Sequence, residues 1–346
     1  MTTQPAAPPR IGARLRQAAD ERALIHELEP EMERLVERHL STCKEWYPHE
    51  FVPWSLGRDF ERDEVWDPDD VPMPEEVRSA LFVNLLTEDN LPYYFRTLER
   101  MFGSKGIWRD WSHRWVAEEG RHAQALRDFA LTTRALDPRT LEDGRMAQMS
   151  GGQVPEPPSA VDGFVYVAMQ ELATRIAHRN TARSMQEALG DHPAAAPGYE
   201  LLSRVATDEN FHFIFYRDLT TAALEISPSL VLEAIERQVR TFEMPGTGIP
   251  GFKQHADAIA RAEIYSLAQH HDQILQPVVM KWWRIEALQG LSAEAEQARE
   301  RLLAQVTRIG QVAARLADRA RAAAERARDI ARDRVGDRPR PRSAGS

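Results

Sequence analysis

The chain has 346 residues, of which 42% are hydrophobic and 28% are charged, and its formal net charge is −9. This length and apolar content suffice for one large domain with a sizeable core. The single cysteine, Cys43, excludes a disulfide framework within the chain and fits a reducing cytoplasm. No apolar run approaches the ~20 residues of a membrane span, and residues 1–10 lack a signal-peptide core. We therefore expect a cytoplasmic protein without a transmembrane segment and without a nucleic-acid partner.

In chain order, we predict a disordered N-terminus over residues 1–10, one all-α domain over 11–335 and a disordered Arg/Pro tail over 336–346. The domain begins with a predicted helix over 11–42. Residues 43–75 contain five prolines among aromatic residues, which indicates an ordered loop that covers the rest of the domain. The long Pro-, Gly- and Ser-rich connection over 136–160 divides two halves. Further helices are predicted over 228–242, 253–270 and 272–288. Residues 292–335 are rich in Ala, Arg and Glu, which fits either a solvated helix or a basic segment that meets an acidic partner.

The stretch from Trp115 to Leu126 combines helical periodicity with polar residues on an apolar face. Glu119 and His122 lie three residues apart and therefore on one side of a helix. Their face continues in steps of three and four through Trp108, Trp111, Trp115, Leu126 and Phe129. Because such a stripe points into a core, its carboxylate must be neutralised, paired or bound to a metal. The spacing alone is weak, since a chain of this length contains about one Glu-x-x-His by chance.

A second copy of this pair follows ninety residues later, at Glu209 and His212. Its face is again apolar and consists of Leu202, Val205, Tyr216 and Leu219. We predict the two Glu-x-x-His helices over 107–134 and 198–226. Both pairs should face the interior.

Another helix with a single carboxylate in its apolar seam lies upstream of each pair. Glu88 belongs to a helix predicted over 74–102, and Glu171 to one predicted over 160–189. Inside the first of these, Pro92 cannot donate a hydrogen bond to the carbonyl of Glu88, so we expect a kink beside this carboxylate.

Four carboxylates and two imidazoles are intolerable as a bare core, but they suit two divalent cations whose charges they balance. Imidazole and carboxylate favour iron or manganese, and the lack of thiolates argues against a structural zinc site. One Glu from each of two helices and one Glu-x-x-His from each of two others form the ligand set of ferritin-like di-metal proteins. The predicted fold class is therefore an all-α, ferritin-like four-helix bundle extended by additional helices.

Five sequence blocks resemble, in order, those of the soluble acyl-[acyl-carrier-protein] desaturases, in particular the actinobacterial branch. They are Leu86–Pro92, Ala117–His122, Gln170–Thr174, Asn180–Arg183 and Ala206–His212, and Gly290–Glu294 is similar too. The resemblance implies six iron ligands, which are Glu88, Glu119, His122, Glu171, Glu209 and His212. It places Glu119 and Glu209 in the positions that bridge both ions.

The resemblance also implies roles for three further residues. Thr174 matches a hydroxyl beside the oxygen-binding face, although a helical threonine can equally bond the carbonyl four residues earlier. Trp46 and Asp208 match an electron path that runs from a surface tryptophan to a ligand histidine and an aspartate. Asp208 suits such a place because metal-bound histidines usually donate their second N–H to a carboxylate. Packing is the alternative interpretation of Trp46.

Two features depart from the plant members of this family. The first two predicted metal helices are joined by a shorter connection, with 31 residues from Glu88 to Glu119. Arg100 and Met101 occupy the stretch that helps to line the far end of the plant acyl pocket. An inward-pointing arginine there would shorten or redirect the pocket.

The function implied by the resemblance is O₂-dependent desaturation of a saturated acyl chain on acyl carrier protein. Two Fe ions, with Mn as a possible substitute, would supply the oxidising chemistry. Removal of two vicinal hydrogens gives a cis double bond. Reduction of O₂ to water needs four electrons, of which the substrate gives two and reduced ferredoxin the other two. The resemblance further implies a homodimer.

Other functions remain open at this point. A hydroxylase or a ribonucleotide reductase small subunit would use the same ligands, and the latter needs a tyrosine near the metals, for which Tyr93, Tyr94, Tyr166 and Tyr216 are available. The order of the blocks argues against both. A ferritin-like storage protein, or a catalytically silent metal- or acyl-binding homologue, is the non-enzymatic alternative. The sequence leaves open the acyl chain length, the double-bond position and whether the carrier is acyl carrier protein or coenzyme A.

Overall fold

The computed structural model describes residues 11–336, so the predicted disordered segment 1–10 lies outside the described residues. Of the predicted disordered tail 336–346, Gly336 ends a helix, and the rest lies outside the described residues. Within residues 11–336, all regular secondary structure is helical, which confirms the all-α class. No helix in this part of the chain combines the length and the apolarity that crossing a bilayer requires.

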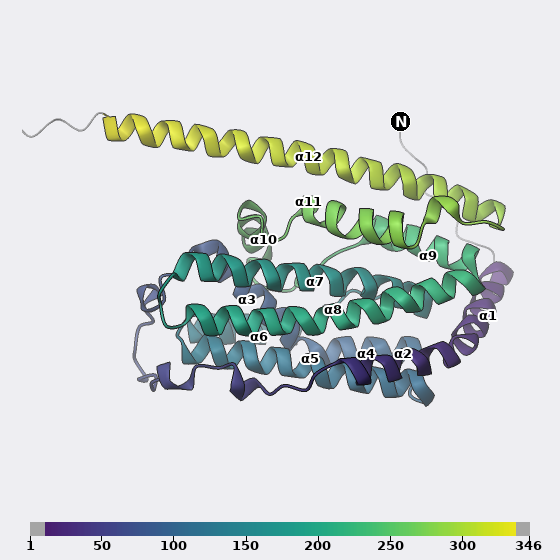
Figure 1. Ribbon diagram of the computed structural model, residues 1–346, viewed down its shortest axis with the longest axis horizontal. Helices are drawn as coiled ribbons and strands as arrows, with labels where there is room; N and C mark the ends of the chain where they lie inside the picture. The colour runs from purple at the N-terminus through teal and green to yellow at the C-terminus, as the bar shows by residue number, and fades with distance from the viewer. Residues whose placement is uncertain (1–10, 337–346) are drawn as a thin grey trace, which may run out of the picture.

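A four-helix bundle forms the centre of the molecule (Figure 1). Its members are α3 (Glu75–Asp89), which α4 (Leu91–Phe102) continues, α5 (Gly106–Thr132), α7 (Ala160–Leu189) and α8 (Ala195–Ile226). Contacts of α3 with α5 and α7, and of α8 with α5 and α7, close the bundle into a ring. These four helical rows correspond to the four predicted metal-bearing helices.

The first row is broken beside the carboxylate that it carries. Asn90 separates α3 from α4, and Pro92 lies in the first turn of α4. The interruption follows from the missing N–H of proline, as expected from the sequence. It leaves Glu88 in the last turn of α3, where its side chain is 7% exposed.

Several predicted boundaries were wrong. The predicted helix over 11–42 is divided into α1 (Ile11–Glu27) and α2 (Glu29–Thr42), because Pro30 cannot donate a hydrogen bond to the preceding turn. By contrast, the predicted loop 43–75 is confirmed up to Pro74 and holds three single 3₁₀ turns, at Pro48–Glu50, Trp54–Leu56 and Pro68–Asp70. The connection over 136–160 contains a helix, α6 (Pro138–Gly151), whose first amides donate to the Asp137 carboxylate.

The C-terminal third forms a layer beside α7 and α8 (Figure 1). It consists of α9 (Pro228–Thr241), α10 (Phe252–Arg261), α11 (Leu267–His270), a π-helix η4 (His271–Trp282), a 3₁₀ turn η5 (Ile285–Ala287) and α12 (Ala293–Gly336). The predicted helix 253–270 is therefore interrupted, and 272–288 is mostly π-helical around Pro277. Beyond α11 and η4, α12 extends as a single long helix (Figure 1).

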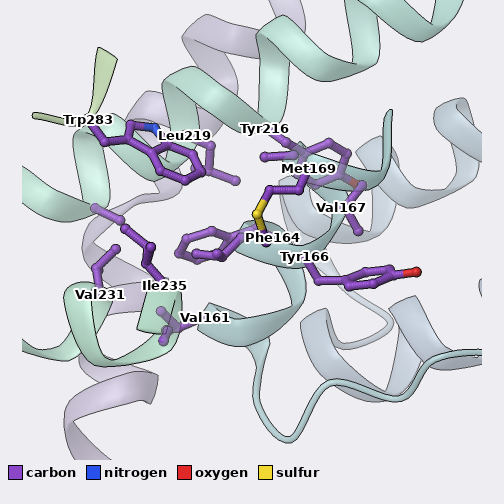
Figure 2. Packing of buried hydrophobic residues seen from close by; sticks show 14 of the residues in the cluster. Val161, Phe164, Tyr166, Val167, Met169, Tyr216, Leu219, Val231, Ile235 and Trp283 are labelled. Atoms are coloured by element: carbon purple, nitrogen blue, oxygen red, sulfur yellow. The ribbon is translucent and has the colours of Figure 1, made fainter. Parts of the chain in front are cut away.

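Buried side chains of α7 and α8 join the bundle to this outer layer. Phe164 and Met169 of α7 pack with Leu219 of α8, Ile235 of α9 and Trp283, as Figure 2 shows. All five are at most 3% exposed. This packing holds α7, which carries Glu171, and α8, which carries Glu209 and His212.

Candidate metal centre

The bundle brings the six predicted ligands together in its interior. They form two overlapping groups, Glu88–Glu119–His122–Glu209 and Glu119–Glu171–Glu209–His212, in each of which the ligand atoms lie within 4.8 Å of one another. Glu119 and Glu209 belong to both groups. Glu119 and Glu209 could therefore offer ligand atoms to both ions of a di-metal site.

Unpaired polar atoms test whether a metal fits these residues. Four buried atoms of the cluster have no hydrogen-bond partner of acceptable geometry: Glu119 Oε1, Glu171 Oε2, Glu209 Oε1 and His212 Nδ1. His212 Nδ1 lies 2.8 Å from Glu119 Oε1, and His122 Nδ1 lies 3.3 Å from Glu209 Oε1. Buried polar atoms are rarely left unpaired. Oxygen and imidazole donors at these separations fit first-row divalent cations.

Electrostatics within the cluster point the same way. Burial and the neighbouring charge of Glu209 raise the pKa of Glu119 and, more strongly, that of Glu171. Burial lowers the pKa of His122 and His212, but the surrounding carboxylates outweigh it and raise both well above 6.5. Without a cation the cluster therefore holds protons, and a divalent cation would displace them.

Asp208 connects one imidazole to the predicted tryptophan. Its Oδ2 accepts a hydrogen bond from Trp46 Nε1 at 2.7 Å and lies 3.3 Å from His122 Nε2. Arg204 donates to Oδ1. Burial raises the pKa of Asp208, but the contact with His122 and the nearby arginine lower it to about 2. The sequence interpretation of Trp46 as a surface residue was wrong, since it is 3% exposed.

An equivalent set of contacts surrounds the other imidazole, and the sequence analysis missed it. Glu118 Oε2 accepts from His212 Nε2 at 2.8 Å and from His39 Nε2 at 2.9 Å, while Arg114 Nε donates to Oε1 at 2.5 Å. The signal was present in the sequence, because Arg114 and Glu118 recur ninety residues later as Arg204 and Asp208.

Two more residues that orient carboxylates were missed. His178 Nε2 lies 2.9 Å from Glu88 Oε1, and Trp115 Nε1 donates to Glu171 Oε1 at 2.9 Å. His178 follows Glu171 by seven residues, which is two helical turns and the same face. This spacing was the only sequence signal for it.

The hydroxyl of Thr174 contacts both a backbone carbonyl of its own helix and a carboxylate of the cluster. Its Oγ1 lies 3.2 Å from the carbonyl oxygen of Gln170, four residues earlier, and 2.5 Å from Glu209 Oε2. A hydroxyl carries one proton, so it donates to one of these acceptors at a time.

An apolar cavity approaches the cluster from the side of α10. It has a volume of about 110 Å³ and is lined mainly by apolar side chains, among them Val83, Met244 and Phe252. Thr87, Thr174 and Pro245 also line a smaller cavity that contacts Glu88 and Glu119. An apolar pocket beside convergent polar groups is the usual form of a small-molecule site.

Arg100 does not enter any of this space. Its side chain is 63% exposed and pairs with Glu156 at 3.2 Å, so the condition under which it would shorten or redirect the pocket, an inward direction, is not met. Met101, its neighbour, packs close to Gly163 of α7.

Of the four tyrosines named as radical candidates, Tyr94 is the one that lines a cavity beside the cluster. It lines the smaller cavity with Glu88 and Glu119, and its hydroxyl is buried without a hydrogen-bond partner. Tyr216 accepts from Trp111 Nε1 at 2.9 Å, and the hydroxyls of Tyr93 and Tyr166 donate to backbone carbonyls.

Comparison with known proteins relates this arrangement to a family. The family model for fatty acid desaturases matches residues 20–332. The DesA1 protein of Mycobacterium tuberculosis is 37% identical over 289 residues, which are 81% of this chain and 83% of that protein. A stearoyl-[acyl-carrier-protein] 9-desaturase of Arabidopsis thaliana is 31% identical over 72% of this chain and 66% of its own length.

A solved structure agrees with the fold. The X-ray structure of DesA2 from Mycobacterium tuberculosis superposes with a TM-score of 0.62 at 27% identity, and the match covers 80% of this chain and 99% of that one. With a family match that spans most of the molecule, this chain belongs to the fatty acid desaturase family.

Proposed function

We propose that the protein is a di-iron, O₂-dependent desaturase that introduces a cis double bond into a saturated acyl chain carried on acyl carrier protein. The observation that carries the proposal is the doubled cluster, in which two buried Glu-x-x-His pairs and two further carboxylates converge. Two bound iron ions would supply the oxidising power to remove hydrogen from an unactivated methylene, which no side chain possesses. The same donor atoms would also bind manganese as a substitute for iron.

The residues of the chain would hold and orient the reactants. Glu88, Glu119, His122, Glu171, Glu209 and His212 would bind the ions. Thr174 lies where its hydroxyl can donate toward the cluster, between Glu209 and the cavity. The apolar lining of the cavity would exclude water and position the acyl chain, with its reacting carbons at the end that contacts Glu88.

Electrons would enter from outside, because the substrate supplies only two of the four that O₂ reduction requires. We propose reduced ferredoxin as the donor, with Trp46 and Asp208 between the donor and His122. The contacts from Trp46 Nε1 to Asp208 and from Asp208 to His122 support this order. A cytoplasmic homodimer completes the proposal.

A single-turnover experiment tests this function. The purified chain is loaded anaerobically with iron(II), given one equivalent of stearoyl- or palmitoyl-carrier protein and reduced ferredoxin, and then exposed to O₂. Mass spectrometry should show the loss of two hydrogens from the acyl chain. An unchanged acyl chain on a protein that holds two irons would refute desaturation of these substrates and favour the metal- or acyl-binding alternative.

Matched variants test the assignment of the ligands. Glu119→Ala removes a carboxylate shared by both groups, whereas Glu225→Ala removes an exposed carboxylate of α8. Iron content and turnover should fall in the first variant and stay unchanged in the second. A Glu119→Ala protein with two irons and full activity would contradict the assignment.

A further inference from the structure

The contacts around His39 suggest a role that the proposed function leaves unassigned. His39 belongs to α2, outside the four helices that carry the cluster, and its side chain is 4% exposed. Its Nε2 lies 2.9 Å from Glu118 Oε2. The same oxygen lies 2.8 Å from His212 Nε2, so one carboxylate oxygen joins the two imidazoles.

The charge of Glu118 determines the proton positions on both rings. Arg114 Nε donates to Oε1, and a carboxylate paired with a guanidinium in this way is the ionised form. An ionised carboxylate accepts hydrogen bonds and cannot donate them. Both imidazoles must therefore carry a proton on Nε2. His212 can then offer Nδ1, one of the four unpaired atoms of the cluster, as a lone-pair donor to a metal.

Comparison with the opposite imidazole gives independent support. There, the Asp208 carboxylate contacts three side chains: Arg204, four residues earlier, His122 on the facing helix and Trp46 in the N-terminal segment. The Glu118 carboxylate likewise contacts Arg114, four residues earlier, His212 on the facing helix and His39 in the N-terminal segment. His39 occupies the place that Trp46 has in the other half.

Packing holds the His39 ring in this orientation. The ring meets Trp111 edge to face at a centroid separation of 4.9 Å and stacks on His212 at 5.7 Å with an interplanar angle of 19°. A donor fixed in this way restrains the rotation of the Glu118 carboxylate. Partners of metal-bound histidines that act through such contacts commonly change metal affinity by about 10–100-fold.

We propose that His39 is a positioning residue that acts through Glu118 to aim His212 Nδ1 at one of the two metal ions. The inference rests on the proposed di-metal function and assigns to His39 and Glu118 the same task for His212 that Trp46 and Asp208 have for His122. A metal ion held by His39, Glu118 and His212 themselves is the competing interpretation, since the three offer ligand atoms within 4.8 Å of one another. The guanidinium of Arg114 on Glu118 disfavours a cation there.

Cobalt(II) titration of the metal-free protein tests the proposal without measuring turnover. The stoichiometry and the two affinities are read by calorimetry, and the ligand field of each ion by its visible absorption. In His39→Phe, which keeps a ring but loses the N–H, one affinity should fall by about 10–100-fold and its absorption should change. The other ion should bind as in the parent protein. His39→Gln, whose amide can donate to Glu118, should recover most of the loss.

His270→Phe is the matched control. This histidine is also buried, at 6% exposure, and its Nδ1 lies 3.0 Å from the hydroxyl of Tyr265, away from the cluster. It should leave both cobalt affinities unchanged, and far-UV circular dichroism checks that every variant is folded. Should His39→Phe fail to fold, His39→Leu, which also lacks a donor, takes its place in the comparison with His39→Gln: the leucine variant should lose affinity at one ion and the glutamine variant should retain it.

The outcomes separate the two proposals. A parent protein that binds no cobalt would refute the di-metal function itself. Two ions bound equally well and with the same absorption in the parent protein and in His39→Phe would refute the positioning role alone. Three ions in the parent protein and two in His39→Phe would identify His39 as a ligand and overturn the inference.

Discussion

Replacing Trp46 with phenylalanine should destabilise the metal-free protein by about 2–3 kcal/mol. The indole N–H donates to Asp208 Oδ2 at 2.7 Å in a buried environment. Hydrogen bonds to charged groups contribute about 1.5–3 kcal/mol. Arg121 and Arg204 also lie over the indole, at 5.3 and 5.7 Å from the ring centroid. Phenylalanine weakens these cation–π contacts, and the smaller ring loses part of its packing on Phe51.

Guanidinium unfolding followed by far-UV circular dichroism measures this loss as a lower midpoint at an unchanged slope. Trp54→Phe is the control, because Trp54 belongs to the same segment but is 52% exposed and donates only to the His49 carbonyl, at 3.2 Å. It should change stability by no more than about 0.5 kcal/mol. Equal midpoints for the two variants would refute the reasoning that the buried contact between Trp46 and Asp208 stabilises the protein.

Three further predictions concern packing, the surface and pH. Gly144→Ala should destabilise by about 1–3 kcal/mol, since its Cβ would lie 2.7 Å from Phe82 Cζ, while Gly151→Ala in the same helix meets nothing within 4 Å; thermal melting that ranks them the other way would contradict this. Arg100→Ala should change stability by less than about 0.5 kcal/mol, because its partner Glu156 is also exposed, and should leave the acyl product unchanged. A shift in product chain length would show that the side chain reaches the pocket. Metal affinity should fall as the pH falls, because the cluster imidazoles have raised pKa values and a proton competes with the cation for each ring; affinity that is constant across neutral pH in a calorimetric titration would contradict this.

The ligand helices could be predicted from the sequence because each has one apolar face with a single kind of interruption. Glu119 and Glu209 stand on stripes whose spacing fixes their direction, and the structure buries both, at 5% and 1% exposure. Near the end of a helix, the same periodicity does not determine which way a side chain points. The sequence therefore placed Arg100 in a helix without fixing the direction of its side chain, which the structure shows to be exposed to solvent.

The missed features depend on contacts between distant segments. His39 is separated by 79 residues from Glu118, which it contacts, and nothing in its own helix distinguishes it, whereas Glu118 could have been found from its recurrence as Asp208. Helix α6 was missed for a different reason, since the Pro, Gly and Ser content of 136–160 outweighed a genuine helix start. Asp137 followed by Pro138 is a capping residue and a favourable first helical position.

The crossed pairing of the two halves has a consequence for assembly. Glu118 of the first half contacts His212 of the second, and Asp208 of the second half contacts His122 of the first. Neither half contains a finished metal environment, and both environments close against one short stretch of the chain, from His39 to Trp46. We therefore expect the cluster to be completed only after the halves have docked and this stretch lies across them, which would couple metal uptake to the last steps of folding rather than to the first.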